Sequence, residues 1–209
     1  MLQVVSSILS EYHAKHGINH RDEFPVRTTL LNPFVEERGV VDKINILEAN
    51  IETEVIVAQV QKFKGQQSVY SGMQDIANIY YAANFNVCWR RFGVCKEMYH
   101  CMIDRSDADR VATVETLQSL LELLAADTTA LIGDFPPLDR EQEAELMALE
   151  TLFPVEFRQT YLENPITDNE VYENIAKQFR IPIEYAIVAC QPNYVRTCTQ
   201  LRGRLLAIT

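Results

Sequence analysis

Positive charge is scarce in this sequence: 19 lysines and arginines stand against 29 aspartates and glutamates, for a net charge of −10. Broad contact with nucleic acid or with an anionic membrane needs clustered Lys and Arg side chains, so we expect neither partner. No apolar run reaches the roughly 20 residues of a membrane-spanning helix. The N-terminus also lacks the charged start, apolar middle and cleavage site of a signal peptide. These absences predict a soluble intracellular protein.

A disulfide framework is also missing. The chain has an odd number of cysteines at irregular spacings: Cys88, Cys95, Cys101, Cys190 and Cys198. This pattern predicts free thiols in a reducing compartment, and therefore a cytoplasmic location. With 209 residues, 47% of them apolar, the chain is long enough to bury a real core as one large domain or two small ones.

The most informative stretch is residues 89–104, WRRFGVCKEMYHCMID. It resembles an amphipathic helix that carries a damaged HExxH motif. In the intact motif, two His at i and i+4 bind zinc from one helical face, and the Glu beside the first His polarises the metal-bound water. Glu97 and His100 hold the second and fifth places, but Lys96 holds the first. A protonated ammonium group has no lone pair, so Lys96 cannot bind a metal.

Periodicity and cap signals predict the local structure around this stretch. Helices are expected over residues 2–16, 87–104, 107–126, 138–152, 154–162, 167–179 and 182–189. Thr167 is expected to open its helix as an N-cap, with Glu170 completing a capping box. A strand is expected over residues 76–83 and a short strand over 68–70. Residues 27–41 read as irregular, 62–66 as a turn, and 43–61 as either strand or helix.

Three segments together resemble the ImmA/IrrE family of zinc metallopeptidase-like proteins, over about residues 76–190. The first is ANIYYAANFNVCWRRFGVCKEMYH, a strand followed by the helix that ends its motif at His100. The second is EQEAELMALETLFP, residues 141–154. The third is IAKQFRIP, residues 175–182. The order and spacing of the three segments carry the resemblance, because KExxH alone is too short to be specific.

The resemblance implies a site as well as a fold. It places Glu143 at the third metal ligand, beside His100, with Glu97 as the general base. Two departures alter that site: Lys96 replaces the first His ligand, and Tyr99 puts a bulky ring where the family has Gly. Cys95 and Cys101 adjoin the motif, but each points about 100° around the helix from its neighbour and is a poor substitute ligand.

We therefore expect an α+β fold that is mostly helical with a small sheet, zincin-like, with residues 87–104 as its central helix. The sequence predicts one metallopeptidase-like domain over residues 1–209, and leaves open whether residues 1–60 are an added segment. The expected function is a non-catalytic peptidase-like domain that binds a protein or peptide partner in regulation, with no cofactor. An active zinc endopeptidase with a rebuilt metal site is one alternative, and a structural helical protein without a site is another.

The sequence also predicts a contact for the Lys96 ammonium group and a helix pair near the C-terminus. Lys96 should stand in for the zinc cation, with its ammonium about 2.7–3.2 Å from a carboxylate of Glu143 or Glu97. Residues 168–190 have the outline of a helix-turn-helix. Their four acids outnumber Lys177 and Arg180, whereas a recognition helix should be basic, so DNA binding is the weaker interpretation.

Overall fold

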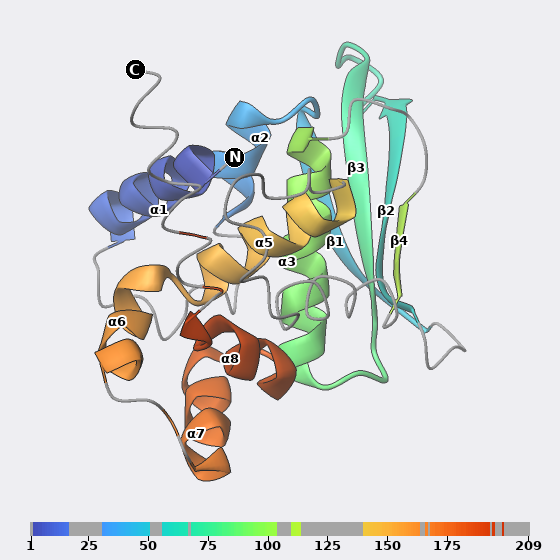
Figure 1. The fold of residues 1–209 in the computed structure, drawn as a ribbon. Helices are drawn as coiled ribbons and strands as arrows, with labels where there is room; N and C mark the ends of the chain where they lie inside the picture. The colour runs from blue at the N-terminus through green and yellow to red at the C-terminus, as the bar shows by residue number, and fades with distance from the viewer. Residues whose placement is uncertain are drawn as a thin grey trace.

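A computed structural model of the chain describes residues 2–16, 31–50, 56–66, 68–103, 110–113, 140–163, 166, 168–192, 194 and 198 (Figure 1). The described residues form an α+β fold, as predicted, in which one small sheet is covered by helices on one side. The helices are α1 (Leu2–His16), α2 (Asn32–Arg38), α3 (Val87–Ile103), α5 (Arg140–Leu152), α6 (Val155–Glu163), α7 (Asn169–Phe179) and α8 (Ile183–Ala189).

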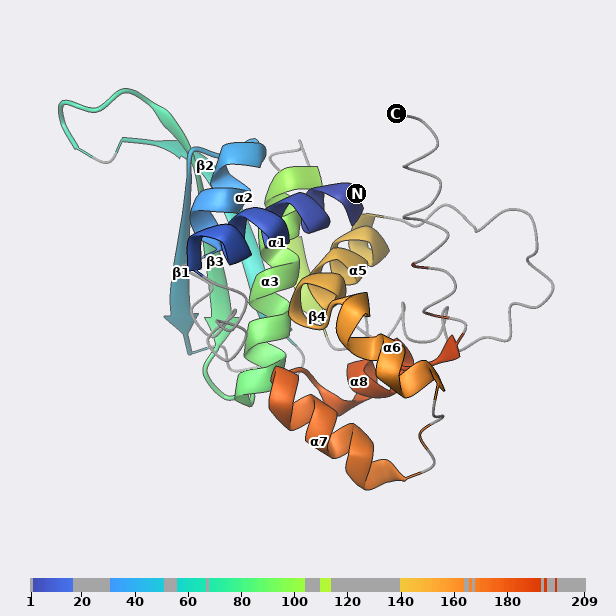
Figure 2. The ribbon, with the colours of Figure 1, turned by 90° about the vertical axis from the view of Figure 1, so that its left-hand side faces the viewer.

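The sheet has four strands in the order β1-β3-β2-β4. They are β1 (Lys43–Ala49), β2 (Ile56–Gly65), β3 (Gln74–Ala82) and β4 (Arg110–Thr113). β3 runs parallel to β1 and antiparallel to β2, and β2 is antiparallel to β4. The apolar, β-branched and aromatic run that predicted a strand at residues 76–83 is this central β3. The β2–β3 hairpin extends beyond the rest of the molecule (Figure 2).

Helix α3 lies between the sheet and α5, which explains why residues 91–101 are all buried. The approach to the sheet depends on Gly93: a Cβ atom there would lie 2.8 Å from Val57 Cγ1 and 3.1 Å from Ala58 Cβ. Both distances are tighter than ordinary contact, so a residue without a side chain lets the α3 backbone sit directly on β2. The predicted central helix is confirmed, and its position fixes the residues of the damaged motif in the core.

The described residues among the first 60 contribute to the same core as the rest of the described chain. Val5 and Ile8 of α1 and Ile44 of β1 belong to one hydrophobic cluster with α3 and α5. β1 also pairs with β3 along its whole length. Among the described residues, no helix is both long and apolar enough to cross a membrane.

Three local predictions upstream of α3 are wrong. Residues 32–38 of the segment read as irregular form helix α2, with Pro33 in its first turn, where proline is tolerated. The turn predicted over 62–66 is instead mostly strand, because β2 continues to Gly65 opposite Gln74. The strand predicted over 68–70 is the turn of that hairpin. At residues 62–65 the pairing of β2 with β3 overrides the turn-like local composition.

Downstream of α3, the helix predicted over 107–126 is contradicted at residues 110–113, which form β4; the remainder lies outside the described residues. Strand β4 pairs with β2 on the side away from β3 and so forms the edge of the sheet. The helices predicted over 2–16, 138–152, 154–162, 167–179 and 182–189 are present within the described residues. The cap of α7 is Asp168 rather than Thr167: its Oδ1 accepts from the Glu170 amide at 2.9 Å.

Candidate functional site

The damaged motif presents Lys96 and His100 together on the face of α3 that meets the start of α5. A spacing of four residues puts both side chains on one side of a helix. Lys96, Glu97 and His100 are all fully buried. The motif therefore lies in the interior between α3 and α5, rather than on an open surface.

The acid that meets this face is Glu141, in the first turn of α5. Its Oε2 lies 2.7 Å from Lys96 Nζ and 3.3 Å from His100 Nε2. The Lys96 contact is a charge pair rather than a well-directed hydrogen bond, since the angles of its atoms do not meet hydrogen-bond geometry. The predicted distance is thus observed, but with Glu141 in place of Glu143 or Glu97. One carboxylate oxygen serves both side chains of the motif.

Electrostatics favours the ionised form of Glu141. Burial by itself would raise the pKa of this carboxyl, but close contact with His100 and the positive charge of Lys96 outweigh burial and lower its pKa to about 2. The Glu141 side chain keeps 24% of its surface exposed, whereas that of Lys96 keeps none. The carboxylate therefore acts as the counter-ion of an ammonium group that has left water completely.

Glu143, the ligand that the resemblance implied, lies elsewhere. Two residues along a helix correspond to a rotation of about 200°, so Glu141 and Glu143 leave α5 on opposite sides. Glu143 lines a surface pocket with Met102 and Met147. Among the described residues it pairs with neither Lys96 nor His100. The helix predicted over 138–152 is present as α5, but the acid of this helix that meets Lys96 is Glu141 and not Glu143.

Tyr99 packs α3 against α5. The Tyr99 hydroxyl is hydrogen-bonded to Thr151 Oγ1. The Thr151 hydroxyl in turn donates to the Met147 carbonyl at 2.8 Å. Burial raises the pKa of Tyr99 far above its usual range. The bulky ring predicted beside the site thus joins the two helices through its hydroxyl and stays neutral, which makes its role structural.

Glu97 has no exposed surface, although the intact motif would use it as a general base at a substrate. A general base must come within hydrogen-bond reach of the water or proton that it activates. A carboxylate that is closed off from solvent on all sides cannot meet a substrate carbonyl in this conformation. Lys96, Glu97 and His100 are thus all closed off from solvent, whereas Glu141 beside them keeps 24% of its side-chain surface exposed.

The motif Arg90-Arg91-Phe92 at the start of α3 is also structural. Arg91 Nη1 donates to the carbonyls of Phe179 and Arg180 at 3.1 and 3.0 Å, at the end of α7. Burial lowers the pKa of Arg91 to about 10. The Phe92 ring stacks on Tyr185 of α8, with centroids 3.9 Å apart. These contacts join the central helix to the C-terminal helix pair.

Sequence reasoning missed a second buried charge network along α5. Glu150 forms a salt bridge with Arg158 of α6 and accepts a hydrogen bond from Tyr194 at 3.1 Å. Arg158 and Glu150 are both fully buried. One turn from Glu141, Glu145 accepts from the Tyr185 hydroxyl. The available signal was that Glu145 and Glu150 stand among apolar residues in the second half of α5, since a buried acid requires a partner.

The cysteines do not rebuild a metal site. All five are free thiols, and Cys95 and Cys101 are fully buried. Burial raises the pKa of each of these two thiols to about 12. Because the thiolate is the metal-binding form, both are poor ligands at neutral pH.

The residues at the motif do not fit zinc, the metal that the resemblance implies. A catalytic zinc usually has three protein ligands, and Lys96 occupies the position of one with a group that only donates. Among the described residues, no group of three His, Cys, Asp or Glu side chains is arranged to hold a metal ion.

Comparisons of the chain with models of protein families, with curated proteins and with solved structures find no match. The family resemblance therefore stays a prediction from its motifs.

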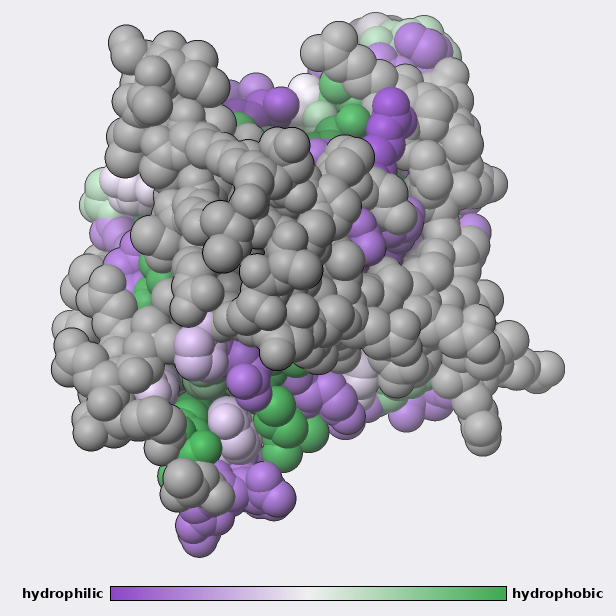
Figure 3. Space-filling view, viewed as in Figure 1, coloured by the Kyte–Doolittle hydropathy of each residue, from purple (hydrophilic) through white to green (hydrophobic). Residues whose placement is uncertain are grey.

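Helices α7 and α8 do form a pair joined by a short turn, the outline expected of a helix-turn-helix. Their exposed charges are mostly acidic, however: Asp168, Glu170, Glu173 and Glu184 are exposed, against Lys177 and Arg180. Figure 3 shows hydrophilic residues at the lower tip of the molecule, with hydrophobic residues among the hydrophilic ones just above it. A phosphate-binding face needs the opposite charge.

Proposed function

We propose that this chain is a non-catalytic, zincin-like domain of the ImmA/IrrE type, which acts by binding a protein or peptide partner in regulation. The contact between Lys96 and Glu141 carries the proposal. At the first ligand position of the damaged motif, a fully buried ammonium group lies 2.7 Å from the acid of a later helix, and His100 shares the same oxygen. A lysine cation occupies the place that a zinc ion would need.

Physical reasoning supports this substitution. An acid and an imidazole that face each other in the interior need a cation or a proton between them, because an unpaired buried charge is costly. Zinc supplies that charge in an active peptidase. Here Lys96 supplies it from within the chain, while the vestigial base Glu97 is closed off from solvent. The scaffold keeps its helices together without a metal and is left with binding as its function.

Metal analysis of the purified protein tests the proposal. We expect no stoichiometric zinc and no chelator-sensitive peptidase activity in the wild-type chain. Lys96→His restores a ligand with a lone pair opposite His100 and Glu141, and we expect it to bind about one zinc per chain. Lys96→Met is the matched control, because it removes the ammonium group without adding a ligand and should bind none.

Two results would contradict the proposal. Zinc at about 2.0–2.2 Å from His100 and Glu141 in the wild-type protein would indicate the active endopeptidase instead. A Lys96→His variant that folds but gains no more zinc than Lys96→Met would remove the argument for a lost metal site, and would leave a structural helical protein.

A further inference from the structure

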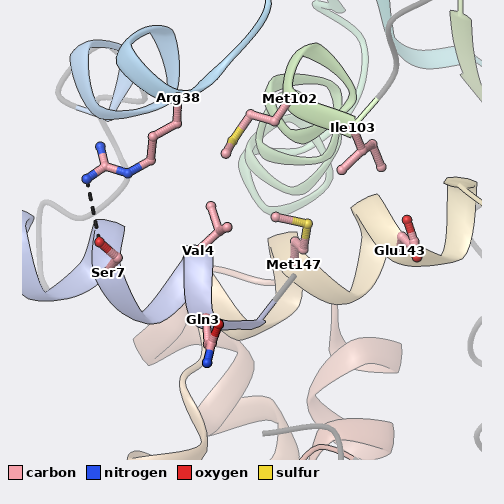
Figure 4. Close-up of a pocket in the computed structure, with 8 residues that line it drawn as sticks. All are labelled: Gln3, Val4, Ser7, Arg38, Met102, Ile103, Glu143 and Met147. Carbon is pink, nitrogen blue, oxygen red and sulfur yellow. Dashed lines mark hydrogen bonds between the residues drawn. The ribbon is translucent and has the colours of Figure 1, made fainter. Parts of the chain in front are cut away.

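A surface pocket of about 660 Å³ lies beside the C-terminal end of α3, where α1, α2, α3 and α5 meet (Figure 4). This volume is within the range of pockets that hold small ligands or partner side chains. Met102 of α3 and Met147 of α5 face each other across its middle, with Val4 of α1 to the side of Met147 and Ile103 to the side of Met102. Arg38 and Glu143 stand at opposite ends.

The two charged residues of the pocket are not equivalent. Arg38 is already neutralised: it forms an ion pair with Glu11, and it donates to the Phe34 carbonyl at 3.0 Å and to Ser7. Glu143 forms no ion pair or hydrogen bond among the described residues. Among the described residues that line the pocket, the uncompensated charge is therefore negative, in a chain whose net charge is −10.

The middle of the pocket is apolar and adaptable. Thioether side chains have three rotatable bonds and a polarisable sulfur, so two methionines facing each other adjust to different apolar side chains. Peptide-binding surfaces that accept amphipathic helices use this property. An apolar side chain between Met102 and Met147 would place a neighbouring cationic group within reach of Glu143.

We propose that this pocket receives a basic, apolar segment of a partner protein, with an apolar side chain between Met102 and Met147 and a Lys or Arg paired with Glu143. The inference rests on the proposed function, which requires a protein or peptide partner, and it names the chemistry of that partner. Charge complementarity decides the occupant, since an acidic segment would meet Glu143 with like charge.

The methionines of the chain provide built-in reporters. Met102, which is partly exposed, and Met147, which keeps only 1% of its surface exposed, line the pocket, whereas Met98 is fully buried and does not line it and Met73 is 62% exposed on the β2–β3 turn. The experiment uses the full chain with ¹³C-labelled methionine methyl groups, assigned by single Met→Leu variants. Three helical peptides serve as probes. All share one stripe of Leu at i, i+3, i+4 and i+7 and carry Lys, Gln or Glu at the remaining positions.

We expect the Lys peptide to shift the Met102 and Met147 methyl signals saturably and to leave those of Met98 and Met73 in place. Glu143→Gln should weaken this binding about fivefold, the upper end of the contribution of a partly exposed ion pair. Glu170→Gln removes the same charge from an exposed position on α7 and should leave the affinity unchanged.

Four results would overturn the assignment: no shift with any peptide, equal binding of the Glu peptide, shifts confined to Met73, or shifts of Met102 and Met147 that follow protein concentration without peptide. The last would identify a second copy of the chain as the occupant.

The zinc measurements on the Lys96 variants do not involve this pocket. If zinc uptake follows expectation while the Lys peptide fails to bind, only the pocket assignment is lost; zinc in the wild-type chain overturns the pseudo-enzyme proposal whatever the peptides do.

Discussion

A single carboxylate oxygen of Glu141 supports two buried side chains. Taking Lys96 out of water carries a large desolvation cost, which only a close negative charge offsets. Glu141 provides it at 2.7 Å and stays partly in contact with solvent. Removing either Lys96 or Glu141 would therefore destabilise the fold, because it would leave the other charge without its partner.

Glu141→Gln tests that dependence. At neutral pH we expect it to lower the free energy of unfolding by about 2–3 kcal/mol, somewhat below the cost of breaking a completely buried pair because Glu141 is partly exposed. The pKa of Glu141 is lowered from its ordinary 4.5 to about 2, so its contribution is present above pH 4.5 and is lost as the pH falls towards 2. The difference between wild type and variant should shrink over the same interval, measured by urea unfolding followed by circular dichroism.

Glu143→Gln is the control on the same helix. It removes an identical charge two residues away, on the side of α5 that lines the pocket. We expect a change within about 0.5 kcal/mol, as for surface substitutions in general. If both variants lost the same stability, or if the Glu141→Gln difference persisted undiminished at pH 2, the Lys96–Glu141–His100 arrangement would not be the cause.

Among the elements, α7 ends in an unusual way. Arg180 follows its last turn in the left-handed conformation, with φ of 51°, a position where glycine is usual. Its carbonyl accepts from Arg91 Nη1, so the strained position is fixed by a contact from α3. The exposed Arg180 side chain itself adds positive charge near Arg91, which contributes to lowering the pKa of Arg91 after the larger effect of burial.

Arg180→Gly should therefore stabilise the protein by about 0.5–1 kcal/mol. Glycine adopts the left-handed conformation without the steric cost of a Cβ atom, which exceeds the backbone entropy that it loses on folding. Thermal unfolding would register the gain as a higher Tm. The paired control is Gln178→Gly, two residues earlier and exposed within α7, which should destabilise by about 1 kcal/mol. Destabilisation by both changes would mean that the Arg180 side chain makes a favourable contact.

In the whole molecule, the position of the helical layer depends on how closely α3 approaches the sheet. Gly93 lets the helix backbone contact Val57 and Ala58 of β2, and the Val57 side chain is stiff because it is branched at Cβ. A change at this point would displace the whole central helix, and with it the position of Lys96 and His100 relative to α5.

Gly93→Ala should destabilise the protein by about 1 kcal/mol or more, although alanine is the better helix former. Overpacking of a close core contact costs about 1–3 kcal/mol. The higher helix propensity of alanine, about 1 kcal/mol over glycine, offsets only part of this cost. Gly72→Ala provides the comparison, since a Cβ atom there meets nothing within 4 Å, and its effect should be near zero. Equal unfolding midpoints in urea for Gly93→Ala and wild type would show that β2 can move away from α3 at little cost.

The sequence by itself determined the features that depend on neighbouring residues. Helix α3, helices α5 to α8 and strand β3 follow from local periodicity and caps, and the shared face of Lys96 and His100 follows from their spacing of four. The chemistry of Lys96 also follows from the sequence, because a protonated ammonium group cannot bind a metal in any fold.

Only the tertiary structure decided which residues meet. The rotation of α5 about its axis is set by packing against α3 and selects Glu141 over Glu143, two acids that sequence pattern alone does not separate. Strand β4 depends in the same way on hydrogen bonds to β2, which is distant in sequence, and the end of β2 depends on its pairing with β3 across the hairpin. The composition of neither segment contains the free energy of that pairing. Local preference fixed what each segment can form, while long-range packing and pairing fixed which side of it faces a partner.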